Sequence, residues 1–201
     1  MAQAPIDFYF DFSSPYGYLA AHRVEALGAE TGREILWHPI LLGVAFKATG
    51  QSPLVSQPLR GPYHLNDMKR SARRLGLPFQ LPDGFPLATM AAARAFYWAE
   101  ATSPVAAKKL ALALLNACFA EGTNITKAET VAAIAADLGF IAEAVMAGIA
   151  DPAIKEKLRA ETDVAIARGV FGSPFFIADG ELFWGNDRLA DLRDWILTGG
   201  W

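Results

Sequence analysis

A serine and a proline stand where a buried strand is expected to turn into a helix. Residues 6–12 are mostly apolar and aromatic, and Ser14-Pro15-Tyr16-Gly17 follow closely. A helix start leaves about four backbone N–H groups without partners and carries roughly half a positive charge, so it attracts an anion. Proline suits the first helical position because its missing N–H would be unpaired there. The turn therefore predicts an anion site.

Ser14 has two possible roles at this turn. Its hydroxyl stays protonated at neutral pH unless a strong base adjoins it, and no histidine or lysine lies close by in the sequence. The hydroxyl can donate one hydrogen bond to an anion from outside the chain. Alternatively, Ser14 only caps the helix, since serine favours the N-cap position. Neither Ser14 nor Gly17 can form a mixed disulfide, which excludes disulfide exchange at this turn.

Two segments near the C-terminal end could complete such a site. Ser173 and Pro174 precede two apolar runs that an Asp-Gly pair separates, which predicts a hairpin. Asn186 and Asp187 would open the last helix, with Asn186 as its cap. A helix start with an acidic side chain suits a ligand that carries both a carboxylate and an ammonium group. Plain capping is the alternative for this pair, and an ordinary loop proline is the alternative for Pro174.

The remaining reactive side chains give weaker signals. Cys118, the only cysteine, lies in an alanine- and leucine-rich run and is predicted to be a buried apolar residue. His22, His38 and His64 are too dispersed for a metal motif, so no metal site is predicted. Tyr16 is expected to be mainly a packing residue, although its place at the turn would let it touch a substrate.

The order of the predicted elements separates the two ends of the chain from its middle. Residues 6–12 and 34–38 predict strands on either side of a helix over 15–31, which is a β-α-β opening. The hairpin and a helix over 187–197 make a β-β-α ending. This order predicts an α/β fold of the thioredoxin type, interrupted by an all-helical insertion. A helical bundle decorated with two hairpins is the alternative.

The middle of the chain is predicted to be helical after an irregular start. Residues 40–62 hold several prolines and glycines and predict a loop, which a polar helix over 62–75 follows. The alanine-rich residues 88–168 predict about five helices. Their start signals are N-cap residues followed by proline, at Ser103-Pro104 and Asp151-Pro152, and a capping box from Thr126 to Glu129.

Three short segments, taken together, resemble one known family. They are Asp-Phe-Ser-Ser-Pro-Tyr at 11–16, Val-Phe-Gly-Ser-Pro at 170–174 and Gly-Asn-Asp-Arg-Leu at 185–189. Their order and spacing resemble those of 2-hydroxychromene-2-carboxylate isomerases, and the first segment also resembles the active-site turn of kappa-class glutathione transferases. The resemblance implies a DsbA-like thioredoxin domain made of residues 1–45 and 165–201, with a helical insertion over 46–164.

The resemblance also implies a cofactor, glutathione, and the residues that bind it. Ser14 would be the catalytic residue that holds the glutathione thiolate. Ser173 and Pro174, joined by a cis bond, would pair with the cysteinyl unit as with an added strand. Asn186 and Asp187 would hold the γ-glutamyl group.

The insertion is implied to reach glutathione and the substrate through Lys47 and the loop that contains Gln51. The family has asparagine where this chain has Gln51, a valine is common at Ser173, and a bulky leucine is common at Ser13. The two serines would make the pocket less crowded and more polar. These departures leave room for a substrate different from those of the family.

The function implied by the resemblance is that of an enzyme, a glutathione-dependent isomerase. It would interconvert 2-hydroxychromene-2-carboxylate-type and hydroxybenzylidenepyruvate-type aromatic compounds by reversible addition of the thiolate. The alternative is a kappa-class-like glutathione transferase or peroxidase that uses the same site irreversibly. A third, non-enzymatic hypothesis is a thioredoxin-like module that binds extended peptides at the Ser173 edge.

Composition and charge indicate which partners and which cellular location to expect. The 201-residue chain is 53% hydrophobic, as in globular proteins with a large core, and its net charge of −3 predicts neither nucleic-acid nor membrane binding. No leader precedes residue 6 and no apolar run could span a bilayer, so we expect a cytoplasmic protein. The basic cluster over 69–74 is expected to be a solvated face, with attraction of an anionic ligand as the alternative. The resemblance adds a homodimer as a possible assembly.

Overall fold

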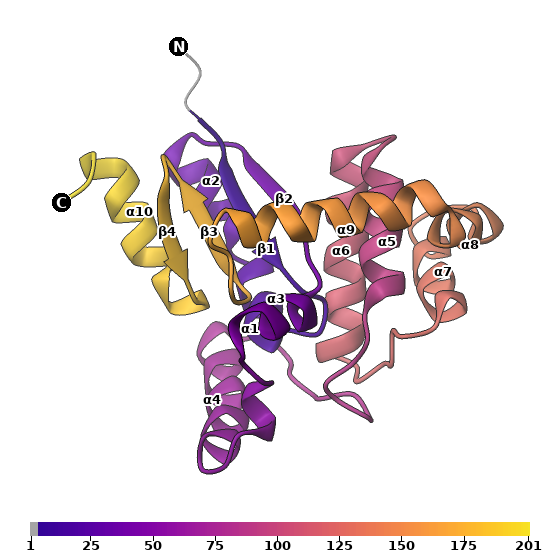
Figure 1. Ribbon diagram of the computed structural model, residues 1–201, viewed down its shortest axis with the longest axis horizontal. Coiled ribbons are helices and arrows are strands. Elements are labelled where there is room, and N and C mark those ends of the chain that lie inside the picture. Colours follow the sequence, from indigo (N-terminus) through magenta and orange to yellow (C-terminus); the bar gives the residue numbers. More distant parts are fainter. Residues whose placement is uncertain (1–3) are drawn as a thin grey trace.

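The computed structural model describes residues 4–201. Within them, four strands form one mixed sheet in the order β2-β1-β3-β4. The strands are β1 (Ile6–Phe10), β2 (Ile35–Pro39), β3 (Phe175–Ala178) and β4 (Glu181–Trp184). β1 runs parallel to β2 and antiparallel to β3, and β3 is antiparallel to β4. The two ends of the chain thus share one sheet (Figure 1), which confirms the predicted thioredoxin-like α/β fold.

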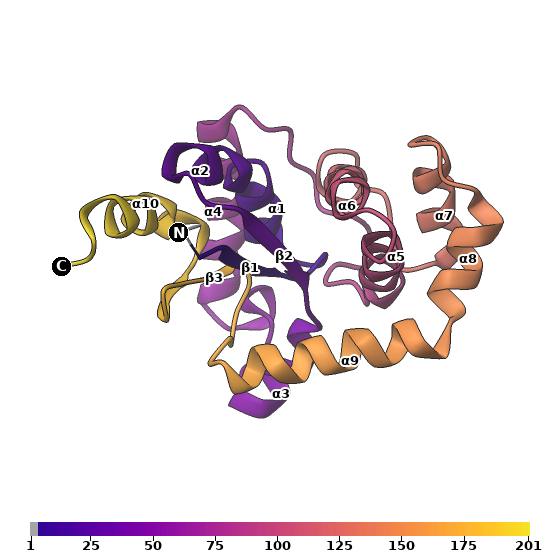
Figure 2. The ribbon, with the colours of Figure 1, turned by 90° about the horizontal axis from the view of Figure 1, so that it is seen from above.

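Helices cover both faces of this sheet. α1 (Pro15–Ala21) and α2 (Val24–Thr31) lie on one face, and the long α9 (Pro152–Ala167) crosses the other (Figure 2). The C-terminal helix α10 (Leu189–Thr198) packs beside α2. Because both faces are covered, the aromatic residues of the central strand can be buried on both sides of the sheet.

The side chains of β1 alternate between two parts of the core. Ile6, Phe8 and Phe10 are fully buried in a large cluster that they share with α1, α2 and the insertion helices. Tyr9 points the other way, into a small cluster beneath α9. Phe8 also stacks on Phe176 of the neighbouring β3, with ring centroids 5.3 Å apart. This packing fixes the end of β1, where the Ser14 turn begins.

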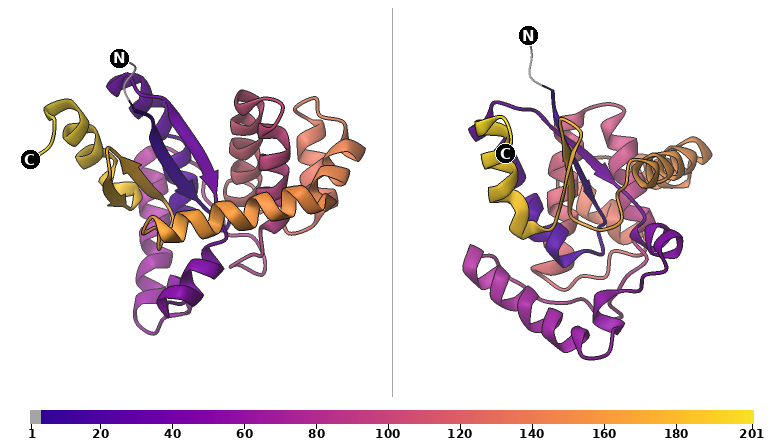
Figure 3. Two further views of the ribbon diagram at one scale, coloured as in Figure 1. Left: turned by 45° about the horizontal axis from the view of Figure 1, so that its top comes forward. Right: turned by 60° about the vertical axis from the view of Figure 1, so that its left-hand side comes forward.

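The insertion between β2 and β3 is helical. Its elements are α3 (Leu42–Thr49), the short 3₁₀ helix η1 (Leu54–Ser56), α4 (Arg60–Leu75), α5 (Met90–Glu100), α6 (Pro104–Phe119), α7 (Ala128–Ala136), α8 (Ala142–Ala150) and α9. α5 to α8 form a bundle beside β2, whereas α3 and α4 lie near the end of β1 where α1 starts (Figures 1 and 3). The five predicted helices of the middle region are confirmed as α5 to α9, and the polar helix is confirmed as α4.

Three predicted details are wrong. The first helix is interrupted at His22 and Arg23, between α1 and α2. Thr126 donates its hydroxyl to Asn124 and makes no capping bond to α7, whose N-cap position is Lys127. The predicted loop over 40–62 contains α3, whose first backbone N–H donates to the distant side chain of Asp11. A cap from another segment leaves no local signal, which explains why the sequence suggests a loop.

The division into residues 1–45 with 165–201 and an insertion over 46–164 stays a prediction. Both boundaries fall inside helices, the first within α3 and the second within α9. Each of these helices therefore continues from one part into the other without a linker. No helix in the described part of the chain combines the length and the apolar character that crossing a bilayer requires.

Candidate functional site at the start of α1

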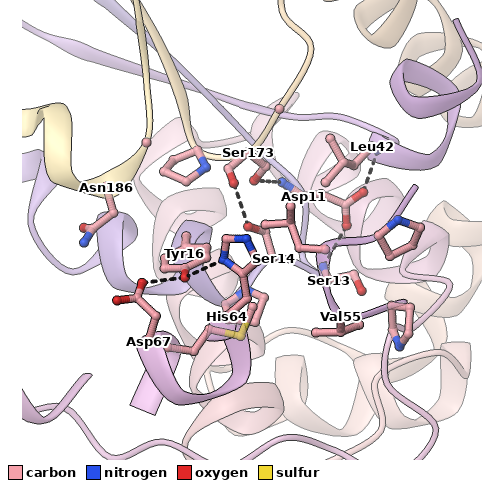
Figure 4. Close-up of a pocket in the computed structure, with 18 of the residues that line it drawn as sticks. Asp11, Ser13, Ser14, Tyr16, Leu42, Val55, His64, Asp67, Ser173 and Asn186 are labelled. Atoms are coloured by element: carbon pink, nitrogen blue, oxygen red, sulfur yellow. Dashed lines mark hydrogen bonds between the residues drawn. The ribbon is translucent and has the colours of Figure 1, made fainter. Parts of the chain in front are cut away.

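A cavity of about 1360 Å³ opens beside the first residues of α1. Its walls come from the turn after β1, from α3 and the loop behind it, from α4, and from the segments before β3 and after β4 (Figure 4). Six of the predicted site residues line it: Ser14, Gln51, Ser173, Pro174, Asn186 and Asp187. Segments more than a hundred residues apart in sequence thus meet around one space.

Ser14 is the N-cap of α1, and Pro15 occupies the first turn as predicted. Its side-chain oxygen accepts a hydrogen bond from the backbone N–H of Gly17 at 3.0 Å. The same hydroxyl donates to the backbone carbonyl of Ser173 at 2.9 Å. Ser14 is only 5% exposed, yet it borders the cavity. The capping role is thereby confirmed, and the single hydroxyl hydrogen would become available to a ligand once that ligand replaces Ser14 at the Ser173 carbonyl.

Ser173 lies opposite this turn and precedes a cis bond to Pro174, as the resemblance implies. Its hydroxyl oxygen accepts a hydrogen bond from the backbone N–H of Asp11 at 2.9 Å. Its carbonyl faces Ser14. The serine therefore connects the segment before β3 to the end of β1 through both its side chain and its main chain.

Asp11 joins three segments around the site, and it was not among the predicted site residues. Its carboxylate accepts hydrogen bonds from the backbone N–H groups of Ser13 and Leu42, both at 2.7 Å, and from the hydroxyl of Thr89 at 2.8 Å. Burial raises the pKa of Asp11 in spite of these three donors. An acidic residue at the end of a buried strand, two positions before a serine, is the signal that could have found it.

Asn186 and Asp187 form the rim near the end of β4. They belong to a short 3₁₀ turn, η2 (Asn186–Arg188), and α10 begins only at Leu189, so the expected capping of a helix by Asn186 is wrong. The backbone and side-chain oxygens of Asn186 instead accept from Arg23, at 2.9 and 3.0 Å. Burial lowers the pKa of Arg23, and the positive charge of Arg74 lowers it further. Arg23 thus contacts Asn186 directly, and Arg74 lies close enough to Arg23 to affect its charge.

Of the two site residues predicted in the insertion, one lines the cavity and the other does not. Gln51 lines the cavity, just after α3 ends at Gly50 with a φ of 68°. Lys47 is exposed on α3 and is not among the lining residues. A cation on the wall comes from α4 instead, where Arg74 lines the cavity. Part of the basic cluster over 69–74 thus faces a binding space, which agrees with the alternative of attracting an anionic ligand and not with a wholly solvated face.

The α4 wall also carries groups that the sequence left unassigned. The hydroxyl of Tyr16 donates to the carboxylate of Asp67 at 2.6 Å and lies 3.3 Å from Nδ1 of His64. Arg70 pairs with the same carboxylate and donates to the hydroxyl of Tyr63 at 2.8 Å. All five side chains line the cavity. No local pattern distinguishes them from an ordinary solvated helix face, because only the docking of α4 against α1 brings them together.

Other candidate groups lie away from this site. Cys118 is fully buried as predicted, and burial raises the pKa of its thiol to about 12. Among residues 4–201, no group of three or more metal-ligating side chains is placed to hold a metal ion.

Comparison with known proteins gives matches over nearly the whole length of the chain. A family model for the DsbA-like thioredoxin domain matches residues 5–196. The chain is 31% identical to a 2-hydroxychromene-2-carboxylate isomerase of Pseudomonas putida, over 94% of this chain and 92% of the relative. It is 25% identical to human glutathione S-transferase kappa 1, over 93% and 88% of the two chains. A solved 2-hydroxychromene-2-carboxylate isomerase superposes with a TM-score of 0.85 at 29% identity, covering 96% of this chain and 94% of the other.

Proposed function

The chain belongs to the DsbA-like thioredoxin family and, within it, to the 2-hydroxychromene-2-carboxylate isomerases, and from this we propose that it is a glutathione-dependent isomerase. Its substrates would be a cyclic 2-hydroxychromene-2-carboxylate-type compound and the open hydroxybenzylidenepyruvate-type isomer. The names of its relatives, which include kappa-class glutathione transferases, support this substrate class and this cofactor.

The hydrogen bond between Ser14 and the Ser173 carbonyl is the observation that carries the proposal. The cysteinyl unit of glutathione has a backbone N–H donor and, when ionised, a sulfur acceptor. Its N–H would replace the Ser14 hydroxyl at the Ser173 carbonyl, and the released hydroxyl would donate to the sulfur. One internal bond would thus become two bonds to the ligand. The N–H of Gly17 would continue to hold the Ser14 oxygen in place.

The rest of the cavity suits the two ends of glutathione and an acidic substrate. Asn186 and Asp187 would hold the γ-glutamyl group, where Asp187 offers an exposed carboxylate to the ammonium. Gln51 would contact the tripeptide from the insertion. Lys47 lies off the wall, so the substrate carboxylate would meet Arg74, which has no carboxylate partner among residues 4–201.

The reaction would use the external sulfur as a nucleophile. The thiolate adds to the electron-poor double bond of the open compound, and the electron pair moves to the keto oxygen as an enolate. The former double bond is now single, so it rotates. Expulsion of the thiolate restores the alkene in the other geometry. Ser14 and the start of α1 would stabilise the thiolate before addition and after expulsion.

Two measurements test this function. Isothermal titration calorimetry with reduced glutathione should give saturable binding, and ultraviolet spectroscopy should then record glutathione-dependent interconversion of the two aromatic isomers. S-methyl glutathione should bind more weakly, because its sulfur cannot ionise. Equal binding of the two tripeptides without any turnover would favour the peptide-binding module. An absence of heat with natively folded protein would disprove the proposal.

A kappa-class-like transferase or peroxidase is the second candidate. The similarity to human glutathione S-transferase kappa 1 over most of the chain favours it, as do the polar Ser13 and Ser173 in place of bulkier residues. It predicts conjugation of an aryl halide or reduction of a hydroperoxide at a rate above that of isomer interconversion. Assays of the three reactions with the same enzyme preparation separate the two functions.

A further inference from the structure

Three side chains form a continuous hydrogen-bonded chain on the α4 side of the cavity. Asp67 accepts the hydroxyl hydrogen of Tyr16 at 2.6 Å, and the same hydroxyl oxygen lies 3.3 Å from Nδ1 of His64 (Figure 4). Tyr16 is two positions beyond Ser14 on α1, whereas the other two lie on α4. These hydrogen bonds therefore link the α4 wall of the cavity directly to the turn that carries the proposed thiolate site.

The single hydrogen of the Tyr16 hydroxyl determines which group donates in each of these two hydrogen bonds. A tyrosine hydroxyl has one hydrogen, and the short bond gives it to Asp67. Burial and the neighbouring Asp67 both raise the pKa of Tyr16, so the phenol keeps that hydrogen. Nδ1 of His64 must then be the donor to the Tyr16 oxygen. In the neutral imidazole, Nε2 is left with a free lone pair.

The position of the imidazole favours contact with a bound molecule. His64 lines the cavity, and its ring has no hydrogen-bond partner other than Tyr16 in the described part of the chain. Tyr63 packs edge-on against the ring with centroids 5.5 Å apart, and Arg70 holds the hydroxyl of Tyr63. The ring is thus held from two sides while Nε2 stays available for a ligand.

We propose that His64 is a catalytic residue that carries a proton between two substrate oxygens, and that Tyr16 and Asp67 position it. This inference rests on the proposed isomerase function, whose cyclic and open compounds differ by a proton shift. Ring closure joins the phenol oxygen to the keto carbon. The phenol loses its proton, and the keto oxygen becomes a hydroxyl.

His64 would serve both halves of that exchange. As the phenol oxygen attacks, its proton passes to Nε2, and the electron pair of the keto bond moves onto the keto oxygen. The resulting imidazolium then returns the proton from Nε2 to this new alkoxide. No other reactant is consumed, and ring opening is the reverse. The Asp67 carboxylate would stabilise the imidazolium through the Tyr16 hydroxyl, as an orienting acid does for a catalytic histidine.

The test compares His64→Gln with His22→Gln in the 201-residue protein. His22 is an exposed histidine whose ring bonds to Asn116, outside the cavity. His64→Gln should lower kcat for isomer interconversion by about 10²-fold, the low end of what a general acid–base contributes, whereas His22→Gln should retain wild-type kcat. Glutathione affinity and the thiolate absorbance of the complex should stay unchanged in both variants.

Two further variants separate chemistry from structure. In His64→Ala, added imidazole should restore part of the lost kcat, and it should have no effect on the wild type. Tyr16→Phe should lower kcat with little change in KM, because it removes the support for the imidazolium and leaves the cavity lining in place.

The outcomes distinguish the two proposals. A wild-type protein that binds no glutathione or converts neither isomer disproves the isomerase and the proton carrier together. An active wild type together with a fully active His64→Gln variant disproves only the role of His64. Loss of activity in folded His64→Ala without rescue by imidazole, together with unchanged kcat in Tyr16→Phe, also overturns it, because the effect would then be structural.

Discussion

The hydroxyl of Ser14 donates its only hydrogen to the backbone carbonyl of Ser173, 159 residues away in the sequence, at a distance of 2.9 Å. Each group thereby satisfies the other in the absence of a ligand, so neither is left without a partner at the edge of the cavity. A ligand must offer both an acceptor and a donor to replace this bond without loss. The ionised cysteinyl unit of glutathione offers both.

Replacement of Ser14 by alanine should raise the pKa of bound glutathione. The variant loses one hydrogen bond to a charged group, which is worth about 1.5–3 kcal/mol and corresponds to roughly one to two pKa units. Ultraviolet titration of the thiolate in the complex measures the shift. Ser103→Ala is the matched control, because Ser103 also caps a helix that starts with proline but lies outside the cavity. An unchanged thiol pKa in Ser14→Ala would contradict the proposed role.

A methyl group at Gly17 should disturb the same pair of serines. A Cβ at this position would lie 3.1 Å from both the Ser14 Cβ and the Ser173 hydroxyl oxygen, which is tighter than ordinary van der Waals contact. We expect Gly17→Ala to weaken glutathione binding by about tenfold, measured by calorimetry. Gly43→Ala is the control, since Gly43 also lines the cavity but a Cβ there meets no atom within 4 Å, so it adds a methyl group without a clash. Equal affinity in the two variants would show that the serine pair tolerates displacement.

Asp11→Asn should destabilise the protein. The amide has one oxygen in place of two, so at least one of the buried donors from Ser13, Leu42 and Thr89 loses its acceptor. The loss of a buried hydrogen bond costs about 1–3 kcal/mol, and urea unfolding measures it. Asp137→Asn, at an exposed helix end, should change the free energy of unfolding by less than about 0.5 kcal/mol. A similar loss of stability in both variants would mean that the hydrogen bonds of the Asp11 carboxylate do not stabilise the fold.

A charged cluster on the opposite face of the sheet should give the folded state a defined pH optimum. His38 lies between Asp7 and Glu161, at 2.9 and 3.6 Å. Burial opposes its charge, but the bonds and charges of these two acids outweigh burial and raise the pKa of His38. The bond to His38, helped by Lys157, lowers the pKa of Glu161 to about 2.

Both shifts stabilise the folded state, but their contributions are lost at opposite ends of the pH range. The contribution of His38 is complete below its unfolded pKa of about 6.5 and is lost as the pH rises through the higher folded pKa. The contribution of Glu161 is complete above its unfolded pKa of about 4.5 and is lost as the pH falls towards 2. Both therefore act fully between about pH 4.5 and 6.5.

Glu161→Gln tests this window. It should lower the free energy of unfolding by about 1–2 kcal/mol near pH 5.5, a value reduced for partial exposure, and the difference should vanish near pH 2. Urea unfolding across pH 2 to 8 measures it. Glu156→Gln, on the exposed side of the same helix, should have little effect. A pH-independent loss in Glu161→Gln would contradict the linkage.

Site residues at the ends of predicted strands and helices could be found from the sequence. Site residues in the middle of a polar helix could not, because the sequence does not show which face of that helix lines the cavity. Ser14, Ser173 and Asn186 each stand next to a strand or helix end, and the strand order brings these ends together. His64 and Asp67 lie within α4, where polarity alone does not show which face meets α1. Lys47 was placed by resemblance alone, and the rotation of α3 turns it outward.

The hydrogen bonds of Asp11 distinguish two walls of the cavity. Substitutions on the wall bonded to Asp11 should destabilise the fold, whereas substitutions on the α4 wall should be better tolerated. Any change that shifts the starts of α3 or α5 breaks bonds to a buried carboxylate, so the cost falls on the whole protein. α4, which Figure 3 shows extending away from the sheet, has no bond to that carboxylate among the described residues. An effort to retarget this scaffold to another aromatic compound should therefore vary the cavity-lining positions of α4 other than His64 and Asp67 and leave the Asp11 side intact.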